Sequence, residues 1–313
     1  MKRLMTAFAS TLLIMGCAVA SAQDNTNTST NEVQAKADDF VLGGLYQFET
    51  INFPKDPFTQ LLGINDFNVI AGYHGSGMTP TTPNKGFMLT GPAVFTLENF
   101  PLSAQTQVIG INNTSDTDGF YVDQKGNTHG FIRVAGNYAT VDFPGTTFNQ
   151  LLGLNNLEQA AGYWQDAHGN FHPYVWDQKG GVFESILIPG SVSAQATGIN
   201  DRQSVVGFFI DSKGVNHGFL LSHGALTKLD YPRATFTQAL GVNRHDDVVG
   251  TYMDAAGLTH GFLWLDGQFH NIDDPSGVGS TVVNGINDRR LIVGFYGNVA
   301  GGISNGFVAA PQF

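Results

Sequence analysis

Residues 238–272 read QALGVNRHDDVVGTYMDAAGLTHGFLWLDGQFHNI, and this stretch decides the fold. It holds four strand-sized apolar pieces, at 238–243, 247–253, 260–265 and 268–272, separated by turns that contain Gly, Asp and Asn. Short strands divided by such turns predict consecutive β-hairpins. The stretch is therefore expected to form one four-stranded antiparallel unit.

The same unit recurs six times along the chain. Each copy contains a Gly-(Ile/Leu/Val)-Asn triplet, and successive triplets begin 43 to 47 residues apart, at Gly63, Gly110, Gly153, Gly198, Gly241 and Gly285. A second glycine follows each triplet start by nine residues, and a Gly-Phe pair, usually preceded by His, follows in most copies. Four strands in about 44 residues, repeated six times, predict an all-β fold: a six-bladed β-propeller with four-stranded blades.

The two ends of the repeat region predict how the ring closes. The last copy stops after its third strand, near residues 307–310, while residues 44–52 form a strand that no earlier copy accounts for. This N-terminal strand is expected to complete the last blade, which removes two exposed sheet edges. The alternative, an open solenoid, usually has shorter or helical repeats.

The first 22 residues resemble an export signal. Lys2 and Arg3 precede an apolar run over 4–19, and Ala20-Ser21-Ala22 forms a small-x-small cleavage site. We therefore predict a signal peptide over 1–22 and an extracellular or periplasmic protein. A retained membrane anchor is the alternative, but the run is short for a membrane span.

Cys17, the only cysteine, opens a second alternative for the N-terminus. The residues Ile14-Met15-Gly16-Cys17 resemble a lipobox, so lipid anchoring at Cys17 competes with soluble export. Residues 23–40 are mostly polar and are expected to form a disordered linker, which suits both alternatives. The propeller is expected to occupy residues 41–313. Cleavage after Ala22 would leave no cysteine, so no disulfide supports it.

Composition excludes some classes of partner. The formal net charge is -11, and removal of the two basic residues of the signal makes it about -13. A chain this acidic has no basic footprint for nucleic acid, and an anionic membrane surface would repel it. No transmembrane segment is expected in the mature chain. The sequence contains no phosphate loop, dinucleotide fingerprint or zinc pattern, so neither a cofactor nor a metal is predicted.

The repeat resembles that of the HAF-repeat family of probable extracellular repeat proteins. The matching elements are Gly198-Ile199-Asn200, Val205-Val206-Gly207 and His217-Gly218-Phe219, with their counterparts over about residues 41 to 313. This chain often has His-Gly-Phe where the family tends to have His-Ala-Phe. The resemblance implies an exported β-repeat protein and no assigned reaction, so it transfers no catalytic residue.

Residues that recur in every blade are expected to serve the blade. The triplet asparagines stand at the first hairpin turn, where Asn readily bonds its own backbone; a ring that holds a metal or a ligand is the alternative. Four blades also share the pattern Asp-x-x-Gly-x-x-His, beginning at Asp123, Asp166, Asp211 and Asp254. This pattern describes a hairpin turn, in which Gly supplies the positive φ.

Five glutamines mark a candidate ligand site. They stand three residues before the triplet glycine, where the innermost strand begins, and are Gln60, Gln107, Gln150, Gln195 and Gln238; the sixth blade has Val282. In a propeller this position lies on the face of the blade-to-blade connections, near the channel. Such amides could bond sugar hydroxyls, or each other and the connecting loops.

Departures from the repeat supply the candidates for catalysis. Asp118 stands where the other blades have Ala or Val, and a buried carboxylate is costly unless it is paired or protonated. The alternative is a local bulge that exposes residues 115–118 to water. His74 replaces an aromatic residue, and His168 lies in the second hairpin of the third blade. The loop 75–85 could cover one edge of the channel.

These features predict a non-catalytic exported binding module, with a carbohydrate or another cell-envelope component as its ligand. One alternative is a secreted hydrolase or lyase with a single site at the channel mouth, where Asp118 and His74 or His168 would converge. The other is a structural or assembly scaffold that binds partner proteins. Standard catalytic motifs are absent or lie in the wrong structural context.

Overall fold

The structure is a computed structural model, and it describes residues 46–56, 58–75, 83–298 and 304–312. The predicted signal peptide, its Cys17 and the predicted linker lie outside these ranges, as does most of the loop 75–85. Within the described ranges, no helix has the length and apolar character needed to cross a lipid bilayer.

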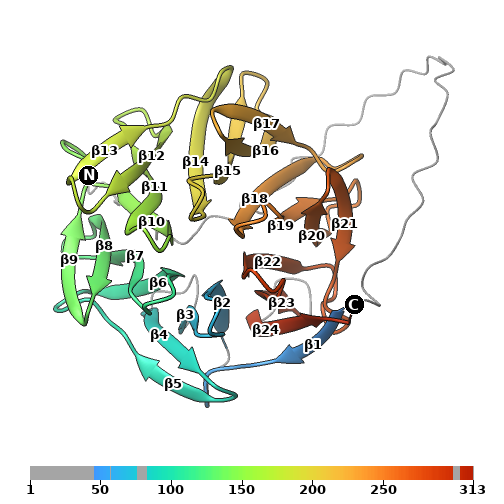
Figure 1. The fold of residues 1–313 in the computed structure, drawn as a ribbon, viewed down its shortest axis with the longest axis horizontal. Helices are drawn as coiled ribbons and strands as arrows, with labels where there is room; N and C mark the ends of the chain where they lie inside the picture. Colours follow the sequence, from blue (N-terminus) through green and yellow to red (C-terminus); the bar gives the residue numbers. More distant parts are fainter. Residues whose placement is uncertain (1–45, 57, 76–82, 299–303, 313) are drawn as a thin grey trace, which may run out of the picture.

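The described strands form six antiparallel sheets of four strands, arranged as the blades of a β-propeller (Figure 1). Blades 1 to 3 comprise β2 (Thr59–Ile64), β3 (Ile70–His74), β4 (Lys85–Thr90) and β5 (Val94–Leu97); β6 (Gln105–Ile111), β7 (Thr117–Val122), β8 (Thr128–Val134) and β9 (Asn137–Val141); β10 (Asn149–Leu154), β11 (Gln159–Gln165), β12 (Phe171–Asp177) and β13 (Val182–Ser185). Blades 4 to 6 comprise β14 (Ser191–Ile199), β15 (Val205–Asp211), β16 (Asn216–Ser222) and β17 (Ala225–Leu229); β18 (Phe236–Val242), β19 (Val248–Met253), β20 (Thr259–Leu265) and β21 (Gln268–Ile272); β22 (Thr281–Ile286), β23 (Ile292–Gly297), β24 (Ser304–Pro311) and β1 (Tyr46–Thr50).

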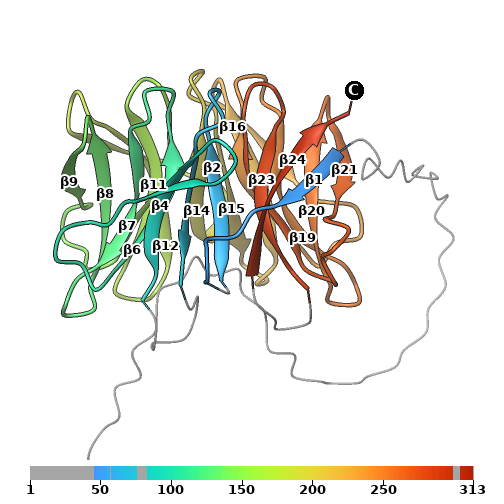
Figure 2. The same ribbon diagram turned by 90° about the horizontal axis from the view of Figure 1, so that it is seen from below.

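The N-terminal strand closes the ring, as the sequence predicts. Strand β1 pairs antiparallel with β24, from Tyr46 opposite Pro311 to Thr50 opposite Phe307. Figures 1 and 2 show this blue strand beside the red strands of the last blade. The fourth strand of blade 6 therefore comes from the other end of the chain, which ties the two ends of the propeller together.

Two glycine landmarks of the repeat have separate packing roles. A Cβ on Gly72, in the second strand of blade 1, would lie 2.9 Å from Cζ of Phe87, so this glycine leaves room for the aromatic ring of the Gly-Phe pair. A Cβ on the triplet glycine Gly63 would lie 2.4 Å from the carbonyl oxygen of Ile109 in the next blade. Replacing either glycine would thus collide with a neighbour that the fold keeps close.

Aromatic residues of the third strands fill the space between blades. They are fully buried in every blade: Phe87, Phe131, Tyr174, Phe219, Phe262 and Phe307. Burial of a large ring contributes roughly 2–3 kcal/mol of transfer free energy, so these six positions are a major part of the core.

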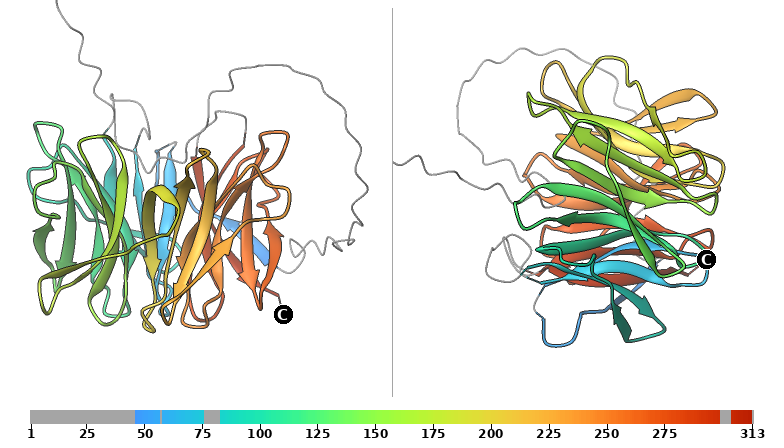
Figure 3. Two further views of the ribbon diagram at one scale, coloured as in Figure 1. Left: turned by 90° about the horizontal axis from the view of Figure 1, so that it is seen from above. Right: turned by 90° about the vertical axis from the view of Figure 1, so that its left-hand side faces the viewer.

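Chain direction defines two faces of the ring. We call the face with the turns between first and second strands the first-hairpin face, and the opposite one, with the turns between second and third strands and the blade-to-blade connections, the connection face. Figure 3 shows the strands running between the two. The innermost strand of each blade starts at the connection face and ends in the Gly-x-Asn triplet at the first-hairpin face.

Candidate functional site at the two ends of the channel

On the first-hairpin face, the triplet asparagines build the turns that the sequence predicts. The Asn200 side-chain oxygen accepts hydrogen bonds from the backbone N–H groups of Arg202 and Ser204, both at 2.9 Å. The other five asparagines make the same pair of bonds, two and four residues ahead. This local bonding is the reason that Asn recurs in every blade.

The same asparagines also connect neighbouring blades. Asn200 Nδ2 donates to the carbonyl oxygen of Asn243, 2.8 Å away, and four other triplet asparagines donate to the carbonyl of the next triplet asparagine. The exception is Asn112, whose Nδ2 contacts Asp116 of its own turn. With both ends of the amide bonded, these side chains have little capacity left for a metal or a ligand.

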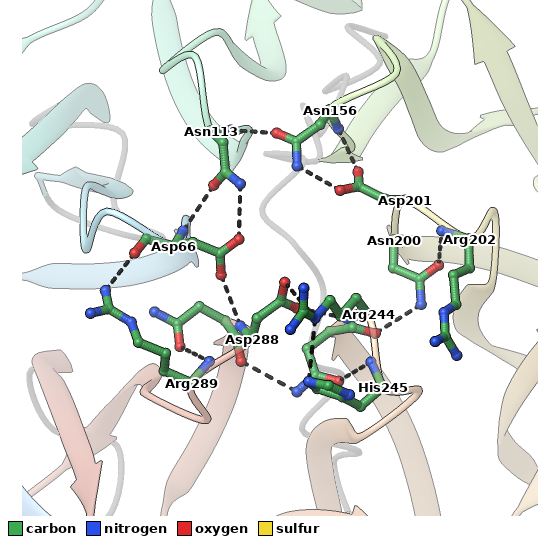
Figure 4. Close-up of polar contacts among 12 residues, drawn as sticks. Asp66, Asn113, Asn156, Asn200, Asp201, Arg202, Arg244, His245, Asp288 and Arg289 are labelled. Carbon is green, nitrogen blue, oxygen red and sulfur yellow. Dashed lines mark hydrogen bonds and ion pairs between the residues drawn. The ribbon is translucent and has the colours of Figure 1, made fainter.

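The residues directly after these asparagines form a second ring, which we call the rim: Asp66, Asn113, Asn156, Asp201, Arg244 and Asp288 (Figure 4). The rim follows one rule, in which the backbone N–H of each residue donates to the side-chain oxygen of its counterpart in the next blade. The five bonds that obey it measure 2.7 to 2.9 Å. Asp201 breaks the rule because its counterpart, Arg244, has no acceptor.

Side-chain contacts saturate most of the remaining rim atoms. Asn113 Nδ2 donates to Asp66, Asn156 Nδ2 donates to Asp201, and the Arg244 guanidinium pairs with Asp288 at 3.3 Å. Burial raises the pKa of Asp288, and the negative charge of Asp66 raises it further. The rim therefore links neighbouring blades, and most of its polar side-chain groups already have hydrogen-bond or ion-pair partners.

A constriction lined mainly by apolar residues lies between the rim and the other end of the channel. It is lined by one residue from each innermost strand: Leu62, Ile109, Leu152, Thr197, Leu240 and Asn284. The free volume there is about 20 Å³, room for about one water molecule. This narrow point lies between the rim and the connection-face end of the channel, and the two ends are separate regions.

The five predicted glutamines begin the innermost strands at the connection face; with Val282 they form what we call the glutamine layer. The residue before the glutamine, or before Val282 in blade 6, anchors the strand in five blades, because its side chain accepts a hydrogen bond from a backbone N–H of the preceding connection. These anchors are Thr59, Thr106, Asn149, Thr237 and Thr281. In the strand register Gln60 lies opposite Tyr73, Gln107 opposite Phe120 and Gln150 opposite Tyr163.

The glutamines of blades 1 to 3 share one environment. Their register partners Tyr73, Phe120 and Tyr163 form a single buried cluster with Leu62, Ile109 and Leu152 of the constriction. Gln107 and Gln150 are fully buried, and Gln60 nearly so. In blades 4 to 6 the equivalent partners are Phe208, Thr251 and Phe295, and there Gln195 is only half-buried.

The buried glutamines differ in how far their amides are satisfied. Tyr73 donates its hydroxyl to Gln60 Oε1 at 2.5 Å, and Gln60 Nε2 contacts the Ser304 hydroxyl at 3.4 Å. The Tyr163 hydroxyl donates to Gln150 Oε1, but Gln150 Nε2 has no partner among the described residues. For Gln107 neither amide atom has a partner in those residues, and Oε1 lacks one because Phe120 stands where blades 1 and 3 have tyrosine.

Asp118 is fully buried, so the expectation of a turn that exposes residues 115–118 to water is wrong. Asp118 Oδ1 accepts a hydrogen bond from the backbone N–H of Gly110 at 2.8 Å. Burial raises the pKa of Asp118 to about 7, although hydrogen bonds from the backbones of Gly110 and Gly153 oppose the rise. The bulge itself is present, since the pairing of β6 with β7 skips from Val108 to Ile111.

The carboxylate therefore bonds the innermost strand of its own blade and lies close to the backbone of Gly153 in blade 3. This is the seam at which Asn112 makes no bond to the next triplet asparagine. Asp118 thus has a structural contact within blade 2, beside blade 3.

The structure does not bring the three predicted catalytic candidates together. His74 lies at the connection face, where Nδ1 contacts Asp56 at 2.9 Å and the ring stacks on Phe53. His168 lies on an exposed hairpin, and its side-chain Nδ1 lies 4.0 Å from Asp166. Asp118 begins its strand near the first-hairpin face and shares no contact with either histidine.

The Asp-x-x-Gly-x-x-His pattern forms the second hairpin of its blade. In blade 4, Asp211 Oδ1 accepts two backbone N–H bonds, Gly214 has a φ of +83°, and His217 lies between Asp211 and Asp230. Blades 2 and 5 repeat this arrangement. Among the described residues no group of three or more His, Cys, Asp or Glu side chains is arranged to hold a metal ion.

Sequence reasoning did not identify the residues that determine the bonding of the glutamines. Tyr73, Phe120 and Tyr163 each follow their glutamine by thirteen residues, so the signal was present in the repeat. The rim was missed for another reason. Its residues look like ordinary turn residues until the neighbouring blade, more than 40 positions away, is brought beside them.

The chain is similar in fold to several solved propellers. TolB from Acinetobacter baumannii is 12% identical with a TM-score of 0.54, and the match covers 78% of this chain and 64% of that one. The Aleuria aurantia lectin, solved in complex with Fucα1-6GlcNAc, is 11% identical with a TM-score of 0.50, and the match covers 82% and 98%.

A third similar structure is a mutant of AofleA from Arthrobotrys oligospora, 10% identical with a TM-score of 0.50, over 89% of this chain and 97% of that one. No family model matches the sequence, and no curated protein matches it. Identities this low establish a shared β-propeller fold and nothing about ligands or reactions.

Proposed function

We propose that this protein is an exported, non-catalytic binding module whose ligand, a carbohydrate or another cell-envelope component, binds at the connection-face end of the channel. The observation that carries the proposal is the buried Gln107 amide, which has no hydrogen-bond partner among the described residues. A buried polar group that the fold leaves unsatisfied costs stability, so its retention favours a role in binding.

Three further observations support this choice of end and of function class. The rim is saturated by bonds between blades, so the opposite end has more unused hydrogen-bonding capacity. The three candidate catalytic residues lie apart, so they do not form the single site that the hydrolase or lyase alternative predicted. The same fold can hold a saccharide, since the Aleuria lectin was solved with one.

Export and family membership are part of the proposal. They rest on the sequence pattern of residues 1–22 and on the resemblance of the repeat to the HAF-repeat family. Mass spectrometry of the protein from its own host would test both forms of export. A mature N-terminus at Gln23 supports soluble release, and a lipid-modified Cys17 supports the anchored alternative.

A binding screen tests the function. The mature chain would be applied to a glycan array and to a panel of cell-envelope components. Any bound ligand would then be titrated against Gln107→Leu and against the control His168→Ala, which truncates an exposed side chain of the second hairpin of blade 3. We expect Gln107→Leu to weaken binding and His168→Ala to leave it unchanged; an absence of binding to every component would contradict the proposal. Capture of a partner protein alone would favour the scaffold alternative.

A further inference from the structure

Blades 1 to 3 present an incomplete set of glutamine–tyrosine pairs. In blades 1 and 3 a tyrosine hydroxyl donates to the glutamine Oε1, which fixes the amide and turns Nε2 away from the tyrosine. In blade 2, Phe120 cannot make this bond. The result is three buried amide groups without partners among the described residues: Gln107 Oε1, Gln107 Nε2 and Gln150 Nε2.

These three groups define a hydrogen-bonding pattern. An amide oxygen accepts and an amide nitrogen donates, so the pattern offers one acceptor and two donors from neighbouring blades. A hydroxyl both donates and accepts, and a compound with adjacent hydroxyls can therefore match all three. Tyr73, Phe120 and Tyr163 add apolar ring surface beside them, which suits the C–H faces of a sugar ring.

Charge restricts the ligand further. The glutamine layer and its register partners contain only neutral side chains. Burial raises the pKa of Tyr73 and of Tyr163, so both hydroxyls stay protonated over the physiological range. A carboxylate or sulfate placed among them would lose its hydration without gaining a counter-charge, which is strongly unfavourable.

We infer that Gln107 and Gln150 bind one uncharged sugar or similar polyhydroxylated unit between blades 2 and 3, an inference that rests on the proposed binding function. The unit bonds the three open amide groups and lies above the constriction that Ile109 and Leu152 help to form. Because Gln107 and Gln150 are covered in this conformation, entry requires a local opening on the connection face.

The substitution Phe120→Tyr tests the inference by supplying the hydroxyl that blades 1 and 3 already have. That hydroxyl would occupy Gln107 Oε1 and compete with the ligand. Phe208→Tyr is the matched control, because Phe208 lies opposite Gln195 at the same register position in blade 4. Affinity for neutral and for acidic glycans, measured by calorimetry, and thermal stability are determined for both variants and for Gln107→Leu.

We expect Phe120→Tyr to weaken binding of a neutral glycan roughly ten-fold, the value of about one hydrogen bond, without lowering the melting temperature. Gln107→Leu should weaken binding at least as much, and it replaces Phe120→Tyr if that variant does not fold. Phe208→Tyr should leave affinity unchanged.

The outcomes separate this inference from the proposed function. Preference for acidic glycans that is still lost in Gln107→Leu would overturn the neutral ligand class and leave the binding function standing. Equal effects of Phe120→Tyr and Phe208→Tyr, or binding that Gln107→Leu does not alter, would overturn the site and again leave the function standing. Failure to bind any component would overturn both.

Discussion

The two ends of the channel use the same kind of side chain for opposite purposes. At the rim, amide and carboxylate side chains form hydrogen bonds with the neighbouring blade, as Asn113 does with Asp66. In the glutamine layer, the Gln107 side chain is just as polar and more deeply buried, yet its amide has no hydrogen-bond partner among the described residues. A buried polar group contributes to stability only where it is satisfied, so the rim links the blades while the unsatisfied Gln107 amide lowers stability.

The largest expected change in the free energy of unfolding comes from removing a hydrogen-bonded asparagine at the first-hairpin end of the channel. Asn200→Ala removes two bonds within the turn and two to the next blade, from Asn200 Nδ2 to Asn243 and to Asp246. At about 1 kcal/mol for each hydrogen bond, the free energy of unfolding should fall by about 3–4 kcal/mol in urea denaturation. Arg202→Ala, which removes an exposed side chain of the same turn, is the control. A loss below about 1 kcal/mol would show that the triplet asparagine contributes little to the links between blades.

The sequence alone predicts only some of the hydrogen bonds that Asn200→Ala removes. The recurrence of Asn and its place in a turn follow from the triplet spacing, as does the six-bladed fold. The links from blade to blade do not, because they join residues more than 40 positions apart whose approach depends on the closed ring. The repeat itself shows only that Asn200 is equivalent to Asn243.

Asp118 provides the second test, on the seam where the asparagine link is missing. Its pKa in the folded state, about 7, lies above the ordinary value of 3.8. The unfolded chain therefore releases this proton at lower pH than the folded protein does. The contribution of Asp118 to stability is complete below about pH 4 and is lost as the pH rises towards 7.

Asp118→Asn keeps an acceptor for Gly110 and removes the charge. Between pH 5 and pH 8 we expect the wild type to lose about 2–3 kcal/mol relative to this variant, measured by urea denaturation at each pH. Parallel pH profiles for the two proteins would mean that Asp118 is ionised in the folded state without a penalty.

The exposure of Asp118 was the expectation that the structure corrected. A carboxylate at an apolar strand position indicates either a functional site or a local turn to solvent. The sequence does not show that the Gly110 N–H lies unpaired within reach, because the wide bulge between Val108 and Ile111 depends on packing. The glutamines were placed at the connection face correctly. Whether each amide is bonded depends on the residue opposite, and the repeat was not read for it.

The third test predicts a gain in stability instead of a loss. Gln107→Leu replaces an unsatisfied amide by an apolar group of similar length, so the free energy of unfolding should rise by about 1–2 kcal/mol. The equivalent change in blade 1, Gln60→Leu, removes a bonded amide and leaves the Tyr73 hydroxyl without its acceptor, so it should lower stability. If both variants were destabilised equally, the contrast between bonded and unbonded glutamines would have no energetic meaning.

The smallest change in stability is expected from a substitution that completes the set of hydrogen bonds around the rim. Arg244→Asn supplies the acceptor that the Asp201 N–H lacks and gives the ring its sixth link between blades. It also removes the pair between the half-exposed Arg244 side chain and Asp288, which is worth well under 1 kcal/mol at a solvated site. Because the new bond forms at an exposed position, the net gain in unfolding free energy should be about 0.5 kcal/mol.

Removal of the positive charge beside Asp288 opposes this gain, since the nearby Asp66 already disfavours ionisation there. Urea denaturation at pH 5 and pH 8 would separate the two contributions, with the larger gain at the lower pH because the pKa of Asp288 is raised. A loss of stability at both pH values would show that the Arg244–Asp288 ion pair stabilises the rim more than an additional hydrogen bond between backbone N–H and side-chain oxygen does.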